Sequence, residues 1–87
     1  MPATHHLKTW PAFWEAIQRG DKNFEARKND RAFQAGGTLM LRYFDPNEPH
    51  DLTRPPLVRL VTFVLPGGEF GIEPGYVVMG LAEVEQQ

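Results

Sequence analysis

A single segment of the 87-residue chain has the spacing of an amphipathic helix, and this segment limits how the rest can fold. Apolar side chains recur there at positions i, i+3, i+4 and i+7. They are Trp10, Phe13, Trp14 and Ile17. Thr9 is a residue type that caps helix N-termini, and Pro11 suits the first helical turn. Gly20 is suited to the position just after the helix, where it would end it. The sequence therefore predicts a helix over residues 11–19, with both tryptophans packed against the remainder of the domain.

Most of the remaining chain alternates apolar and polar residues, which is typical of strands. The predicted strands are residues 5–8, 23–27, 38–44, 57–65 and 76–84. In the fourth strand, Phe63 is predicted to lie on the same face as Val61. Apolar residues occur on both faces of this strand, which favours a central position covered on both sides. Residues 45–56 are predicted to form a surface loop. A second loop is predicted between the fourth and fifth strands, with Phe70 and Ile72 packed against the domain as its anchors. One helix among short strands predicts a single α+β domain over residues 1–87, a small mixed β-barrel of about five strands.

Composition narrows the functional classes. The chain has no cysteine, which excludes disulfides, thiolate zinc sites and cysteine nucleophiles. The absence of disulfides is compatible with the reducing cytoplasm, where we expect the protein. The longest apolar run, residues 76–79, is too short to span a bilayer, so we expect no membrane partner. His5, His6 and His50 lack the spacing of a metal motif, so no metal or cofactor is expected. With a net charge of −2 the surface as a whole is not basic, so any binding of nucleic acid would depend on a local basic patch.

The most promising local patch is residues 22–31. Phe24 and Ala26 alternate with Glu25 and Arg27, so the two charged side chains share one face of a half-buried strand. Lys22 beside Glu25, with Arg27 to bind a phosphate, carboxylate or base edge, would form the floor of a binding site. The alternative is an exposed strand with an ion pair that contributes less than about 1 kcal/mol. Spacing alone leaves both interpretations open.

The end of this segment also has two interpretations. Asn29 and Asp30 are common turn residues, and a turn is the simpler use of the pair. Lys28 and Arg31 beside them are placed to contact a phosphate backbone.

The chain resembles a small bacterial and phage branch of the ASCH group, within the PUA-like superfamily. The most specific agreement is the run Lys-x-Phe-Glu-x-Arg-Lys-Asn-Asp-Arg at residues 22–31. Weaker agreement comes from His6-Leu7-Lys8, Phe13, Ile17, Gly20, Phe33, Gly36, Leu39, Leu41 and Gly75-Tyr76-Val77-Val78. The resemblance implies a PUA-like barrel and a cleft, roofed by the helix, that takes RNA or a modified nucleoside. The residues expected to bind there are His6, Lys8, Lys22, Glu25, Arg27, Lys28, Asn29 and Arg31.

The resemblance also suggests an enzymatic alternative. Relatives in the ASCH group hydrolyse the acyl amide of a modified cytidine, such as an N4-acylated cytidine, with a lysine, a threonine and a distant glutamate. Lys22 matches that lysine but Glu25 stands at the threonine position, so both are catalytic candidates only if the protein is an enzyme. We therefore expect RNA or nucleotide binding rather than hydrolysis. A third possibility is a phage or mobile-element accessory protein that binds a protein partner through Trp10 and Trp14.

Overall fold

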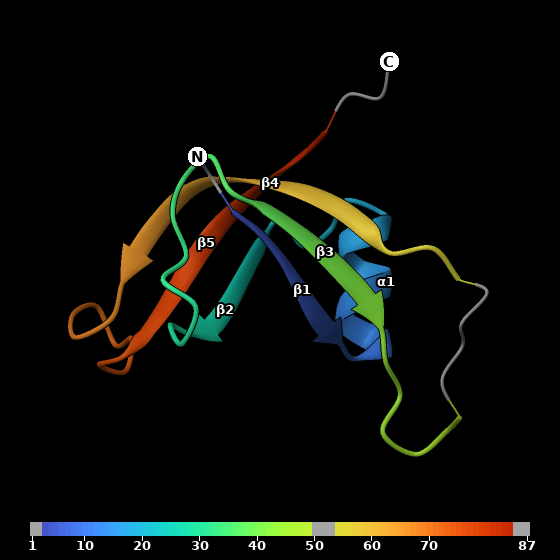
Figure 1. The fold of residues 1–87 in the computed structure, drawn as a ribbon. Coiled ribbons are helices and arrows are strands. Elements are labelled where there is room, and N and C mark those ends of the chain that lie inside the picture. The colour runs from blue at the N-terminus through green and yellow to red at the C-terminus, as the bar shows by residue number, and fades with distance from the viewer. Residues whose placement is uncertain (1–2, 50–53, 85–87) are drawn as a thin grey trace.

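The computed structural model describes residues 3–49 and 54–84, in which one helix and five strands follow one another (Figure 1). The elements are β1 (Thr4–Thr9), α1 (Pro11–Gln18), β2 (Phe24–Lys28), β3 (Thr38–Tyr43), β4 (Leu57–Pro66) and β5 (Tyr76–Glu83). The predicted order of strand, helix and four strands is confirmed, and the boundaries agree to within about one residue. No helix among the described residues is long and apolar enough to cross a membrane.

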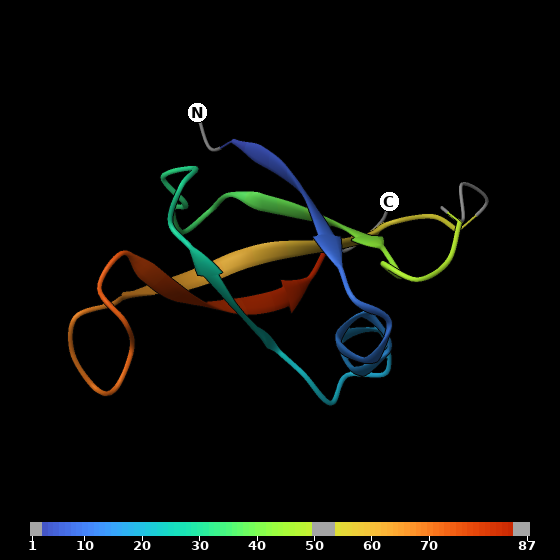
Figure 2. The ribbon, with the colours of Figure 1, turned by 90° about the horizontal axis from the view of Figure 1, so that it is seen from below.

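The five strands form one sheet in the order β1-β3-β4-β5-β2, and this sheet curls so that its edge strands turn toward each other (Figure 2). β1 runs parallel to β3, while the other neighbouring strands are antiparallel. Within the described residues β1 and β2 are not paired, so the sheet is a half-barrel with an open seam between them. The predicted α+β class is confirmed, and the barrel is open along this seam.

The N-terminus of α1 differs from the prediction. Trp10 occupies the N-cap position in an extended conformation and makes no side-chain capping bond. Thr9 is not the cap, because it is the last residue of β1 and its side chain is buried. Pro11 occupies the first helical turn as expected. The chain therefore passes from strand to helix through a single residue, which holds the first turn of α1 beside the end of β1.

Gly20 ends the helix as predicted, with φ +87°. Asp21 N–H donates to the Ala16 carbonyl at 2.9 Å, and Gly20 N–H to that of Ile17 at 3.2 Å, which is the Schellman arrangement. The Ile17 carbonyl also accepts a bond from Arg59 of β4 at 3.3 Å. These bonds fix the helix end against the sheet and direct the chain back toward the seam, where β2 begins.

The core lies between α1 and the concave face of the sheet. It consists of Leu7, Trp14, Ile17, Phe33, Leu39, Leu41, Val61, Val77, Met79 and Leu81. Trp14 is anchored further by a hydrogen bond of 3.0 Å from its Nε1 to the Leu41 carbonyl. The prediction that the tryptophans pack inside is right for Trp14 and wrong for Trp10, which is mostly exposed. The reason is that Trp10 lines the cleft described below and does not face the sheet.

A β-bulge in β4 changes which residues face the core. The register with β5 shifts between Val61 and Phe63, so that Thr62 is the extra residue. The prediction that Phe63 shares the inner face of Val61 is therefore wrong, and Val64 packs against the core instead. β4 is the central strand, as predicted, but Leu60 and Phe63 are exposed, so it is covered on one face only.

The loops follow the predicted turns with one exception. Residues 44–49 and 54–56, the described part of the loop between β3 and β4, form no helix or strand. Ile72 is half-buried, as expected of an anchor. Phe70 is not an anchor, because its side chain projects into solvent and its backbone is left-handed, at φ +56°.

We predict that Leu39→Ala lowers the free energy of unfolding by about 2–5 kcal/mol, because it leaves a cavity where packing is tight. Leu39 is fully buried in the core. The matched control is Leu60→Ala on the exposed face of β4, for which we expect less than about 1 kcal/mol. Urea denaturation measures both variants. Equal losses would contradict the assignment of the concave face as the core.

Candidate functional site

The inner face of β2 carries charged side chains where the neighbouring strand β5 carries apolar ones. Glu25 lies opposite Met79 and Arg27 opposite Val77, and both partners belong to the core. Residues directly opposite each other on paired strands point to the same side, so Glu25 and Arg27 face the concave side of the sheet. The side chain of Glu25 is buried, with the residue only 4% exposed. Phe24, on the other face, is half exposed. On β2 the polar face therefore points toward the core, and the apolar face points toward solvent.

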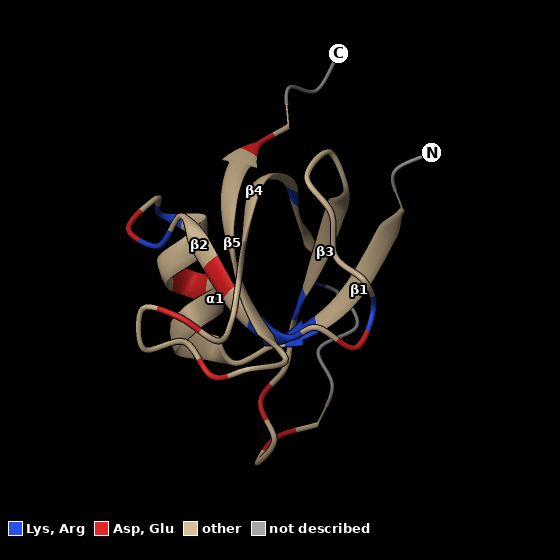
Figure 3. Ribbon diagram, turned by 90° about the vertical axis from the view of Figure 1, so that its left-hand side faces the viewer, with Lys and Arg blue, Asp and Glu red and all other residues tan. Residues whose placement is uncertain are grey.

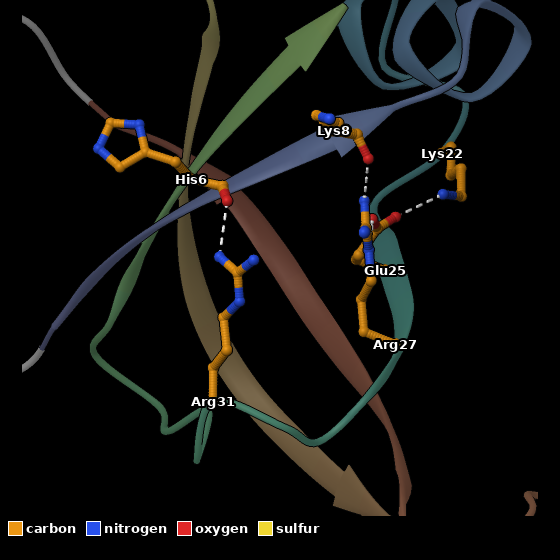
Figure 4. A network of polar contacts seen from close by, with 6 residues as sticks. All are labelled: His6, Lys8, Lys22, Glu25, Arg27 and Arg31. Atoms are coloured by element: carbon orange, nitrogen blue, oxygen red, sulfur yellow. Dashed lines mark hydrogen bonds and ion pairs between the residues drawn. The ribbon is translucent and has the colours of Figure 1, made fainter. Parts of the chain in front are cut away.

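Three side chains form a hydrogen-bonded group, which we call the Glu25 network: Lys22, Glu25 and Arg27. Glu25 Oε1 accepts a bond from Lys22 Nζ at 2.8 Å, and Oε2 accepts one from Arg27 Nε at 2.7 Å (Figure 4). A buried carboxylate without a partner would be strongly destabilising. Here each oxygen has its own cation, which explains how β2 keeps a charge on its inner face.

Two arginines bridge the seam between β1 and β2. Arg27 Nη2 donates to the Lys8 carbonyl at 2.6 Å, and Arg31 Nη1 donates to the His6 carbonyl at 2.7 Å (Figure 4). Backbone carbonyls alternate in direction along a strand, and the Thr9 carbonyl accepts a bond from the chain after β3. The carbonyls of His6 and Lys8 therefore face away from β3 toward β2. The arginines satisfy acceptors that a further strand would otherwise satisfy.

A cleft of about 700 Å³ opens beside the Glu25 network, between the N-terminal part of α1, the end of β1 and β2. Its volume is within the range typical of small-molecule sites. Three aromatic residues line it and are exposed by at least half: Trp10 by 57%, Phe13 by 50% and Phe24 by 50%. Lys22 Nζ lies 4.9 Å from the ring centre of Phe13 and 5.3 Å from that of Phe24. The cleft thus combines aromatic walls with a fixed, charged floor.

Thr9 also lines this cleft and differs from the other polar residues there. The residue is only 2% exposed, and its Oγ1 has no hydrogen-bond partner among the described residues. Sequence reasoning considered Thr9 only as a helix cap and missed it as a site residue. The signal that was available is its position two residues after Leu7, which places both side chains on the inner face of β1.

Of the remaining predicted binding residues, Lys8 also lines the main cleft, whereas the others lie along the seam or turn away from the cleft. Lys28 and Arg31 line a smaller hollow of about 310 Å³, which shares Arg27 with the main cleft. Asn29 acts as a turn residue, because its Oδ1 accepts a bond from the Phe33 N–H at 3.0 Å.

The side chains of His6 and Lys8 contact neighbours outside the Glu25 network. The His6 ring turns away from the seam, and its Nδ1 lies 3.2 Å from Arg42 Nη2 (Figure 4). The His6 side chain therefore does not line the cleft, and only its carbonyl reaches the seam. The Lys8 ammonium lies 4.8 Å from the ring centre of Phe44. Of the other histidines, His5 packs edge-on against Phe33, and His50 lies outside the described residues.

The fold and the site together define a small α+β half-barrel with a polar network and a cleft at its open seam. The model of one protein family, described as "Domain of unknown function (DUF3850)", matches residues 4–81. The match includes the whole of α1 and the complete Glu25 network, so the chain belongs to this family. A comparison with curated proteins gave no match.

We predict that Glu25→Gln lowers the free energy of unfolding by about 1–3 kcal/mol, because Lys22 and Arg27 lose their shared buried anion. The control is Asp21→Asn, which weakens the solvent-exposed pair of Arg19 and Asp21. That change should alter stability by less than about 0.5 kcal/mol. Chemical denaturation of both variants gives the comparison. A Glu25→Gln protein as stable as Asp21→Asn would show that the network contributes nothing to the fold.

Proposed function

We propose that the protein binds single-stranded RNA or a nucleotide, with an unpaired base in the cleft beside the Glu25 network. The observation that carries this proposal is the set of half-exposed aromatic rings on the cleft walls, those of Trp10, Phe13 and Phe24. Large apolar side chains gathered at one concave place on a surface commonly mark a binding site. Flat rings beside fixed cations are the features with which proteins stack and hold single-stranded bases.

The distribution of charge supports the same proposal. The net charge of −2 gives no general attraction for nucleic acid. Basic residues nevertheless follow the seam and the adjoining strands, and they are Lys8, Arg27, Lys28, Arg31 and Arg42. Figure 3 shows blue segments at the ends of β1 and β3, whereas the loop between β4 and β5 carries red ones. A phosphate backbone would follow the basic seam and place its base in the neighbouring cleft.

The resemblance to the PUA-like superfamily adds a third line of support. A curled sheet with a helix at one end agrees in outline with the barrel that the resemblance implies. RNA recognition usually depends on splayed single-stranded bases and aromatic stacking, so it needs only a local patch of this kind.

The two alternative functions are less well supported by the geometry. Lys22 donates to Glu25 at 2.8 Å, and an ammonium held in an ion pair has no lone pair for nucleophilic attack on an amide. A protein-binding surface built from two tryptophans would need both side chains at the surface, but Trp14 is buried and only Trp10 is exposed. We therefore place nucleotide binding ahead of amide hydrolysis and ahead of a tryptophan-based protein interface.

We predict that single-stranded RNA quenches the fluorescence of Trp10, and that the affinity falls when salt is raised from about 50 to 200 mM. Phe13→Ala should weaken binding by about 5-fold or more, because a stacking ring is lost. The control is Phe63→Ala, since Phe63 is 64% exposed on β4 and does not line the cleft. An absence of binding at low salt, or equal affinities for the two variants, would contradict the proposal.

A further inference from the structure

The polar groups on the floor of the cleft are satisfied, with one exception. Both oxygens of Glu25 accept bonds, and both cations of the network donate to it. The Oγ1 of Thr9 is buried, like the carboxylate of Glu25, but has no partner among the described residues. Buried hydroxyl groups nearly always have a hydrogen-bond partner, so this atom needs an explanation.

Packing does not explain a hydroxyl at this position. The inner faces of β1 and β3 carry leucines at Leu7, Leu39 and Leu41. Valine has nearly the same shape as threonine and would fill the position of Thr9 without a buried, unpaired polar atom. We therefore expect the hydroxyl to lower the stability of the free protein, a cost that is typical of groups that serve a ligand. It also occurs at the one position on β1 where the inner face meets the cleft.

We propose that the Thr9 hydroxyl reads the polar edge of the base in the cleft. This inference rests on the proposed function, because it names the residue that would recognise the base there. A hydroxyl both donates and accepts, so it can pair with a carbonyl oxygen, a ring nitrogen or an amino group. The ligand class is therefore a flat heterocycle with a hydrogen-bonding edge, held by stacking on the aromatic walls.

The neighbouring groups are consistent with this role. The Glu25 network directs its hydrogen bonds inward and toward the carbonyl of Lys8, so its members are already engaged. Thr9 Oγ1 is buried in the free protein, so a base reaches it only after the side chains that line the cleft rearrange, and two of these, Trp10 and Phe13, are at least half exposed. Side chains that are half in solvent change rotamer readily, on the nanosecond timescale. A ligand without a polar edge would leave the hydroxyl unpaired and would bind more weakly.

The test compares Thr9→Val and Thr9→Ser with the wild-type protein. The first probes are single-stranded homopolymers of the four ribonucleotides. A further probe is the homopolymer that binds most tightly, with each base replaced by an isostere that has no hydrogen-bonding groups. We expect Thr9→Val to bind the natural oligomer about 3- to 10-fold more weakly and to be at least as stable in urea. Thr9→Ser, which keeps the hydroxyl, should bind within about 2-fold of wild type.

The wild-type protein provides a test that needs no folded variant. It should bind the natural oligomer about 3- to 10-fold more tightly than the oligomer with the isostere. Equal binding of the two oligomers, or a Thr9→Val protein that keeps full affinity but loses stability, would overturn the role of Thr9 while leaving nucleotide binding intact. Failure of every homopolymer to bind would overturn both the proposed function and this inference.

Discussion

The side chain of Arg27 connects the two edges of the sheet and defines the candidate site. One guanidinium donates to the Glu25 carboxylate at 2.7 Å and to the Lys8 carbonyl at 2.6 Å. It therefore neutralises a buried charge on β2 and satisfies the unpaired edge of β1 at the same time. An unpaired edge invites association with other chains, and here arginine side chains occupy it in place of a closing strand. The seam remains open enough to leave a cleft beside it.

The departures from an ordinary apolar core gather around this cleft. Glu25 and Thr9 are polar residues on the inner face, while Trp10 and Phe24 are apolar residues exposed to solvent. The other buried residues on the inner face of the sheet are all apolar. Local rules of folding are most often broken at functional sites, where the loss of stability is offset by the rest of the fold. The concentration of exceptions at one place is therefore an argument for function.

The sequence was sufficient to predict the elements but not which face of each was inside. The spacing of apolar residues and the end at Gly20 predicted α1, and the alternation in residues 22–31 predicted that Glu25 and Arg27 share a face. Alternation does not say which face is inner, and on β2 the apolar face is the exposed one. The bulge at Thr62 was also beyond prediction, because one extra residue turns Phe63 outward without changing the local composition. Thr9 was missed because its position at the cleft depends on where β1 ends, which alternation does not show.

The central claim is that a base of single-stranded RNA binds in the cleft beside the Glu25 network. Amide chemical shifts of the labelled protein, followed during titration with the single-stranded homopolymers, test this claim residue by residue. We expect the perturbed amides to cluster at residues 8–10, 13 and 22–27, which surround the cleft. Shifts concentrated instead on the outer face of β4 around Phe63 and at Phe70, or no shifts at low salt, would contradict the account.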